Sequence, residues 1–166
     1  MTLRLQWWKI GGIAAVIAAG AFFLFRESEE DRIFAKVREL AEVISKPAGE
    51  APAAGLMRLA AIDDIFVPQP EIDLRQEKFC DIVPAGELAG RIAAYRRQLI
   101  EATAGVSDPD FTYITAEKAE LCFTGTLKAS LSGGRISEVR EVEAILVKTP
   151  AGWRISRLVI RPVLER

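Results

Sequence analysis

The apolar positions of this chain fall into one continuous run near the start and into amphipathic patterns afterwards. Residues 10–25 contain no charged side chain. At 1.5 Å per residue, a helix of these 16 residues is shorter than the roughly 30 Å hydrocarbon core of a bilayer. Trp7 and Trp8 suit the headgroup region, and Lys9 can extend its amine to the interface. We therefore expect one membrane-spanning helix over about residues 5–25.

The expected anchor rests on the two tryptophans, the lysine and eight strongly apolar side chains. These are Trp7, Trp8, Lys9, Ile10, Ile13, Val16, Ile17, Phe22, Phe23, Leu24 and Phe25. A cleaved signal peptide is the alternative, with Ala19-Gly20-Ala21 as the cleavage site. Against cleavage, the apolar run continues beyond that site as far as Phe25. The anchor interpretation divides the chain into a tail and anchor, residues 1–26, and a soluble domain, residues 27–166.

Small residues recur along one face of the expected membrane helix. Gly11, Ala15 and Ala19 are spaced four residues apart, which would let another helix approach closely. The alternative is that Gly and Ala are simply frequent in such spans.

The orientation of the chain in the membrane is predicted from the character of its start. A basic start followed by an apolar run is typical of export signals, so we expect a single-pass protein with a cytoplasmic N-terminus. The domain would then be periplasmic or otherwise extracytoplasmic. Counting only Lys and Arg on the two sides of the span does not favour this orientation.

The first half of the soluble domain has the periodicity of helices separated by Pro and Gly. Ile33, Val37, Leu40 and Ile44 follow the spacing of an amphipathic helix, which predicts a first helix over residues 31–46. The same criteria predict the next elements. They are a second helix at residues 56–66, short strands at 71–74 and 78–83, and a third helix at 84–103.

The second half of the domain alternates with the period of β-strands. The predicted strands lie at residues 111–114, 119–131, 136–149 and 153–163, with hairpin turns at 132–134 and 150–152. Val142, Ala144 and Leu146 mark one face of the third of these strands. In the last strand the apolar phase changes after Ile155, which predicts a β-bulge near residues 156–157.

This order of elements resembles the NTF2-like superfamily, the cone-shaped α+β fold of SnoaL-type and ketosteroid-isomerase-type proteins. The closing stretch EVEAILVKTPAGWRISRLVI is similar to the last hairpin of that superfamily. The resemblance covers about residues 31–166 and implies three helices against a curved antiparallel sheet, the cystatin/NTF2-like cone. The anchored layout also resembles the bitopic, periplasmic NTF2-like subunits of type IV secretion machines.

Composition excludes several kinds of site. Three of the 22 basic residues and none of the 23 acidic ones lie in residues 1–26, so the soluble part is acidic and does not suit nucleic acid. The chain contains no histidine, which excludes Ser-His-Asp, Cys-His and His-metal sites. We expect neither a metal nor a cofactor.

The two cysteines leave two interpretations open. Cys80 and Cys122 are too few for a thiolate zinc site and too far apart in sequence for a redox motif. A disulfide between them needs an oxidising compartment and neighbouring strands. Otherwise they are two separate buried thiols.

Candidate catalytic residues come from the resemblance, because enzymes of that superfamily place an acid or base inside the mouth of the cone. Asp73 and Tyr113 are the candidates here. Asp63 and Asp64 are better explained as a solvated helix end, and Tyr95 as part of the core. None of these residues matches a catalytic motif of the family.

The charged run at residues 138–143 is predicted to be the outer, solvated face of a strand, with cross-strand ion pairs. Arg154, Arg157 and Arg161 on the following strand would supply the opposite charges. These residues are therefore not expected to form a site.

Two functions follow. The first is a non-enzymatic interaction or assembly module on the exported face of a membrane, whose partners are the bilayer and other membrane-associated proteins or a second copy. The alternative is a small-molecule-binding or lyase/isomerase-like enzyme that uses a buried carboxylate in the cone. A small-molecule ligand is compatible with both.

Overall fold

The computed structural model describes residues 28–163. The expected membrane anchor, including residues 10–25 and the small face at Gly11, Ala15 and Ala19, lies outside these residues. Among the described helices, none combines the length and the apolar character that crossing a bilayer requires. Residues Arg32–Arg166 form one compact unit.

The helices agree with the sequence patterns in order, but the second predicted helix is divided in two and the bounds differ. They are α2 (Glu29–Ile44), α3 (Pro52–Ala60), α4 (Ile62–Ile65) and α5 (Ala85–Gln98). At the start of α2, the Ser28 hydroxyl accepts from the Asp31 amide at 3.0 Å and the Asp31 carboxylate accepts from the Ser28 amide at 3.2 Å. This reciprocal cap explains why the helix begins where it does.

The second predicted helix is the least accurate of the three. It begins at Pro52 rather than at residue 56, because proline is well suited to the first turn of a helix. The helix is then divided at Ala61 into α3 and α4. Phe66, predicted to be helical, is the first residue of a strand.

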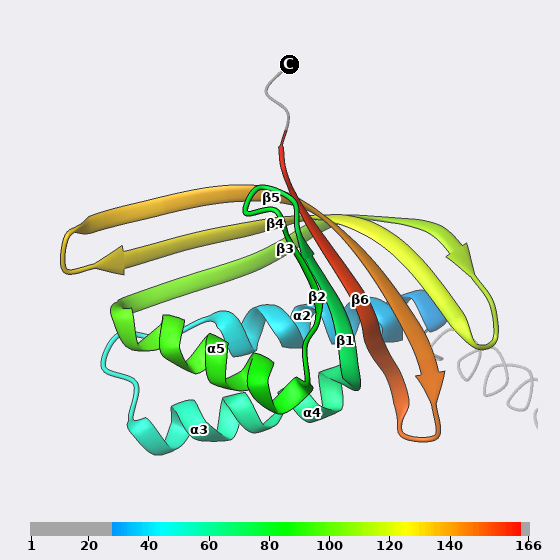
Figure 1. The fold of residues 1–166 in the computed structure, drawn as a ribbon, viewed down its shortest axis with the longest axis horizontal. Helices are drawn as coiled ribbons and strands as arrows, with labels where there is room; N and C mark the ends of the chain where they lie inside the picture. Colours follow the sequence, from blue (N-terminus) through cyan, green and yellow to red (C-terminus); the bar gives the residue numbers. More distant parts are fainter. Residues whose placement is uncertain (1–27, 164–166) are drawn as a thin grey trace, which may run out of the picture. The chain divides into compact units, whose positions relative to one another are not determined.

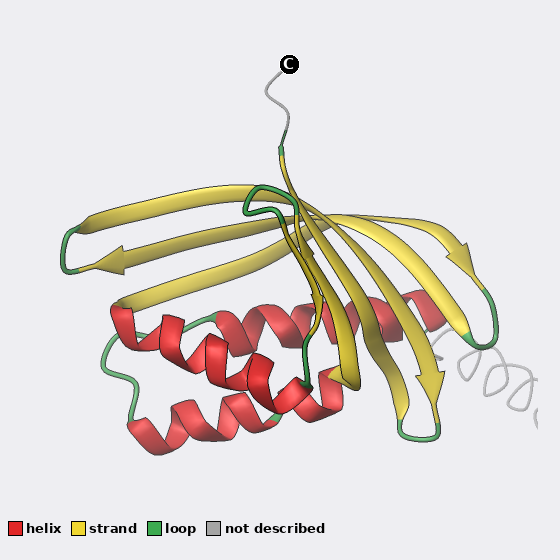
Figure 2. Cartoon of the chain, viewed as in Figure 1, coloured by secondary structure: helices red, strands yellow, loops and turns green. Residues whose placement is uncertain are grey.

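Strands β1 to β6 form, within the described part of the chain, one strongly curved sheet whose concave face is covered by the helices (Figures 1 and 2). The strands are β1 (Phe66–Leu74), β2 (Phe79–Ile82), β3 (Leu99–Ile114), β4 (Lys118–Leu131), β5 (Gly134–Thr149) and β6 (Gly152–Pro162). Their order is β2-β1-β6-β5-β4-β3. The α+β prediction is confirmed, but the sheet is not purely antiparallel, because β1 pairs in parallel with β6.

The third predicted helix is too long at its C-terminal end. Helix α5 ends at Gln98, and residues 99–103, which were predicted as helix, belong to β3. The start of β3 pairs with the end of β4, where Leu99 and Ala102 pack on Ala129. Strand β3 is irregular at residues 107–110, where Asp108 has a φ of 53°.

The predicted β-bulge in the last strand is confirmed. Ile145 pairs with Arg157 and Leu146 pairs with Ile155, so Ser156 has no partner in the ladder. Its hydroxyl donates instead to the Ile145 carbonyl at 3.0 Å. A bulge adds local twist and bend, which suits the curvature of the sheet at this point.

The main core lies between the helices and the concave face of the sheet. It is built from side chains less than about a tenth exposed, among them Ile33, Val37, Leu40, Ile62, Ile65, Phe66, Leu121, Phe123, Leu146, Trp153 and Ile155. The helices pack against the concave face of the sheet alone. They therefore contact only the strand residues whose side chains point to that face.

Candidate functional site

A cavity of about 270 Å³ opens on the concave side of the sheet, against α2. Helix α2 contributes Val37, Leu40 and Ile44 to its walls, and the sheet contributes Phe123 and Val142 among others. These side chains are apolar, so water gains few hydrogen bonds inside and an apolar group is the better occupant. The cavity is therefore the candidate binding site.

Small residues on β3 and β4 keep this space open. Ala104 and Gly125 line the cavity where larger side chains would fill it. A Cβ atom placed on Gly125 would lie 3.3 Å from a methyl group of Val142, which is tighter than ordinary contact. The strand backbone thus forms part of the wall.

The mouth of the cavity carries the polar groups. Glu138 and Arg140 come from β5, and Gln76 and Glu77 come from the turn between β1 and β2. Arg140 Nη2 lies 3.0 Å from Glu138 Oε2, and the two side chains are 29% and 45% exposed. Arg140 Nη1 also donates to the Val139 carbonyl at 3.4 Å. A guanidinium has five N–H donors, and these two contacts use only part of them.

The position of Glu138 and Arg140 corrects the prediction that residues 138–143 form an outer face. Along β5 the inward residues alternate, and Val142 is buried in the core. Arg140 and Glu138 continue the same phase toward the cavity mouth. The predicted cross-strand pairing is confirmed for Arg161, whose Nη2 lies 2.7 Å from Glu143 Oε2. It is wrong for Arg154 and Arg157, which pair with Asp64 and Glu71 instead.

Asp73 does not project into the cavity, contrary to the expectation. Its neighbours Ile72 and Leu74 face the core, and successive side chains on a strand point to opposite faces. Asp73 is 6% exposed and lies on the outer face, where Arg75 Nε is 2.8 Å from its Oδ2. It is a paired carboxylate on the opposite face of the sheet from the cavity, which Leu74 lines.

The other candidates also lie outside the cavity. Tyr113 is 53% exposed and pairs with Glu120 at the far end of β3. Asp63 and Asp64 are exposed on α4, as predicted for a solvated helix end, and Arg154 Nη2 lies 3.5 Å from Asp64 Oδ1.

Tyr95 was expected in the core, but the residue is 39% exposed on α5. Partial burial raises the pKa of its phenol, and the negative charge of Glu138 raises that pKa further. Tyr95 is not among the residues that line the cavity.

The cysteines are not paired. Cys80 on β2 and Cys122 on β4 are free thiols, and β1, β6 and β5 lie between their strands. Cys80 is exposed rather than buried. Desolvation raises the pKa of both thiols, with further increases from Asp73 and Glu71 at Cys80 and from acidic neighbours at Cys122.

Across residues 28–163, acidic and thiol side chains do not gather in any group of three or more that could hold a metal ion.

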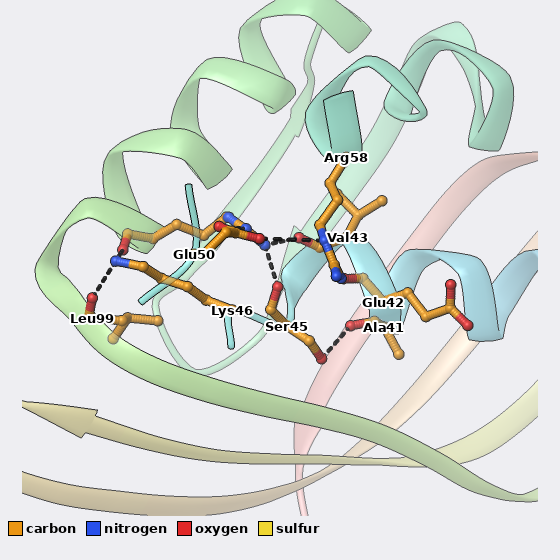
Figure 3. A network of polar contacts seen from close by, with 9 residues as sticks. Ala41, Glu42, Val43, Ser45, Lys46, Glu50, Arg58 and Leu99 are labelled. Carbon is orange, nitrogen blue, oxygen red and sulfur yellow. Dashed lines mark hydrogen bonds and ion pairs between the residues drawn. The ribbon is translucent and has the colours of Figure 1, made fainter. Parts of the chain in front are cut away.

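A second charged cluster is buried away from the cavity, around Arg96 of α5. The Arg96 residue is 4% exposed. Its guanidinium donates to the carbonyls of Val43 and Ser45 and to the carboxylate of Glu50. Figure 3 shows Glu50 and Arg58 facing one another across this cluster, with 3.3 Å between Arg58 Nε and Glu50 Oε1.

Lys46 joins this cluster to the sheet. Its amine donates to the Arg96 carbonyl at 3.0 Å and to the Leu99 carbonyl (Figure 3). Its backbone forms an antiparallel bridge with Ala102, with N–O distances of 2.8 and 2.7 Å. The cluster thus fixes the segment after α2 against α5 and β3. No local sequence pattern predicted this cluster, because Arg96 is about fifty residues from its partners Val43, Ser45 and Glu50.

No protein-family model and no curated protein matches the chain. Solved structures do match. The Kfla4162 protein from Kribbella flavida is 14% identical with a TM-score of 0.71, covering 83% of this chain and 93% of that chain. An NTF2-like protein with a cystatin-like fold from Novosphingobium aromaticivorans is 18% identical with a TM-score of 0.58, covering 81% and 86%.

A hexachlorocyclohexane dehydrochlorinase is also similar, at 13% identity and a TM-score of 0.60, covering 79% of this chain and 82% of that chain. At these identities the likeness concerns the fold. The domain therefore has the NTF2-like α+β fold.

Proposed function

We propose that the domain is a non-enzymatic binding module, held on the exported face of a membrane by residues 1–26, and that the cavity against α2 is its binding site. The observation that carries the proposal is the cavity itself. Its walls are apolar, its volume is about 270 Å³, and its mouth carries an arginine–glutamate pair at 3.0 Å.

The carboxylates of the domain support binding rather than catalysis. A general base in an apolar site works best when burial brings its pKa near neutrality. Asp73 is buried but lies on the opposite face with Arg75. Glu138 lies at the cavity mouth but is 45% exposed and paired with Arg140. The chain has no histidine to take the role.

The membrane location rests on the sequence of residues 1–26. Sixteen uncharged residues, preceded by Trp8 and Lys9, suit a short span with an interfacial aromatic belt. A domain held there would meet other membrane-associated proteins or a second copy of itself, and the small face at Gly11, Ala15 and Ala19 would suit contact between helices.

Thiol labelling tests the membrane location. In a Cys122→Ser variant of the full chain, Cys80 is the remaining thiol and is exposed. We expect a membrane-impermeant maleimide to label it only from the exported side. The raised thiol pKa calls for mildly alkaline labelling, because the thiolate is the reactive form. Labelling only from the cytoplasmic side would reverse the orientation, and extraction by alkaline carbonate would exclude the span.

Two substitutions on β3 test the binding site. Ala104→Phe places a large side chain in the cavity, whereas Thr103→Phe places the same side chain on the outer face, where Thr103 is exposed. We expect crosslinking in native membranes, followed by mass spectrometry, to lose its partners in Ala104→Phe and to keep them in Thr103→Phe and Asp73→Asn. The reverse pattern would contradict a cavity-based module.

A second candidate is a lyase- or isomerase-like enzyme with Glu138 as its base. It is favoured by the position of Glu138 at the cavity mouth and by the structural neighbour named as a dehydrochlorinase of hexachlorocyclohexane. Glu138→Gln separates the two, because an enzyme would lose turnover of its substrate by orders of magnitude, whereas a binding module has no turnover to lose.

A further inference from the structure

We propose that the ligand of the cavity is an uncharged amphipathic molecule, with an apolar body and a head group that both accepts and donates hydrogen bonds, such as a primary amide or an alcohol. This rests on the proposed function, in which the cavity is the binding site. It adds the chemical class of what is bound and the residues that select it.

The size of the body follows from the cavity. An apolar cavity of about 150 Å³ is large enough to hold benzene. The present cavity is roughly twice as large, at about 270 Å³. A medium-length alkyl chain or a two-ring body fits this volume, and the apolar walls favour a body without polar groups.

The head group is selected by the pair at the mouth. Arg140 offers N–H donors beyond those used on Glu138 and Val139. Glu138 offers carboxylate lone pairs and is 45% exposed. A donor and an acceptor are thus held together, about 3 Å apart, at one side of the opening. A primary amide matches both, because its carbonyl accepts from Arg140 and its NH₂ donates to Glu138.

The charges at the mouth disfavour an ionised head group. The charged residues lining the cavity are Glu77, Glu138 and Arg140, two acids against one base. A carboxylate head would be repelled by the excess negative charge. An ammonium head would compete with Arg140 for Glu138 and leave the guanidinium, only 29% exposed, without its partner. A neutral head leaves the pair intact.

Photocrosslinking of the full chain in lipid nanodiscs tests this class of ligand. Three probes share one decyl chain with a diazirine and differ only in the head: amide, carboxylate or ammonium. Crosslinks on peptides of α2, β4 and β5 are counted by mass spectrometry. We expect the amide probe to exceed each charged probe by about tenfold, the factor that one unpaired polar group costs. Ala104→Phe should abolish these crosslinks and Thr103→Phe should not.

Substitutions of Arg140 and Glu138 show which of the two side chains selects the head group of the ligand. Arg140→Met should lower amide crosslinking about tenfold and raise ammonium crosslinking. Glu138→Gln should raise carboxylate crosslinking. Arg140→Lys, which keeps a cation but not the planar donors, should give an intermediate yield. Circular dichroism of each variant confirms that it is folded.

The two proposals fail differently. If the carboxylate or the ammonium probe gives the highest yield in the wild type and is lost in Ala104→Phe, the cavity binds a ligand but the uncharged class is wrong. If all three probes give the same yield in wild type and Ala104→Phe, the crosslinks report lipid partitioning and the cavity is not a binding site.

Discussion

Two arginine–glutamate pairs in this domain have the same chemistry and different surroundings. Arg96 and Glu50 have side chains 5% and 7% exposed, and the arginine also donates to two backbone carbonyls. Arg140 and Glu138 are 29% and 45% exposed and make fewer contacts. The first pair joins the segment after α2 to α5, and the second stands at the mouth of an apolar cavity.

The difference indicates which pair is structural and which can bind a ligand. Charges removed from water must be fully paired, because the desolvation penalty is large and each unpaired group adds to it. Arg96 meets this requirement through contacts within the protein. Arg140 keeps spare donors close to an apolar space, so a ligand can complete its contacts.

Loss of the buried arginine should have the largest effect. Arg96→Met leaves the Glu50 carboxylate in a nearly buried position without its main partner. We expect the free energy of unfolding to fall by about 3–5 kcal/mol, measured by urea denaturation of the full chain in detergent. Arg97→Met is the matched control, since Arg97 is exposed on the same helix, and an equal loss in both would contradict the comparison.

A double-mutant cycle sharpens this prediction. If the cost of Arg96→Met comes from the unpaired carboxylate, adding Glu50→Gln should recover part of it, so that the double variant is more stable than additivity predicts. Strict additivity would mean that the pair does not account for the loss.

Asp73→Asn should have a smaller effect. Asp73 is 9% exposed at its side chain but its partner Arg75 is 55% exposed, so water screens much of the interaction. We expect a loss of about 1 kcal/mol in urea denaturation, with no change in the yield of cavity crosslinks. A loss of cavity crosslinks in Asp73→Asn would show that Asp73 contributes to the binding site.

Arg140→Met should change stability much less than Arg96→Met. The pair at the cavity mouth is partly exposed, and such pairs contribute well under about 1 kcal/mol. We expect the free energy of unfolding to fall by no more than about 0.5 kcal/mol in the same assay, together with the decrease of about tenfold in amide crosslinking. A loss of stability comparable to that of Arg96→Met would contradict the distinction between the two pairs.

The smallest expected effect is a change in the pKa of the Tyr95 phenol. Its pKa is raised by partial burial and then by the charge of Glu138. Removing that charge favours the phenolate, so Glu138→Gln should lower the pKa of Tyr95. In a Tyr113→Phe background, Tyr95 is the remaining tyrosine and ultraviolet absorbance reports its titration. An unchanged curve would show that the carboxylate does not reach the phenol.

The periodicity of apolar residues predicted the fold correctly in those segments whose apolar residues face the core. The helix at α2 and the strands β4 to β6 were predicted with their turns, because their apolar phase is that of the core. The bulge at Ser156 was predicted from a change of phase alone. Residues 99–103 were misassigned to a helix, because pairing with β4 places Leu99 and Ala102 against Ala129 and overrides the local preference.

The site was predicted less well, for two physical reasons. The phase of Val142, Ala144 and Leu146 already placed Arg140 and Glu138 inward, but their charge suggested a solvated face. For Asp73 the phase of Ile72 and Leu74 placed it outward, away from the cone. The partners of Arg96 lie about fifty residues earlier in the chain, beyond any local pattern.

The bridge between Lys46 and Ala102 has a consequence for crowding. Strand β3 is at one edge of the sheet, and unpaired edges can recruit strands from neighbouring molecules. The bridge occupies the start of this edge. Farther along, the irregularity near Asp108 and Pro109 interrupts the regular backbone that another strand would need for pairing. At the opposite edge, β2 has only four residues. Copies of the domain held close together therefore have no long, regular edge through which their sheets would polymerise.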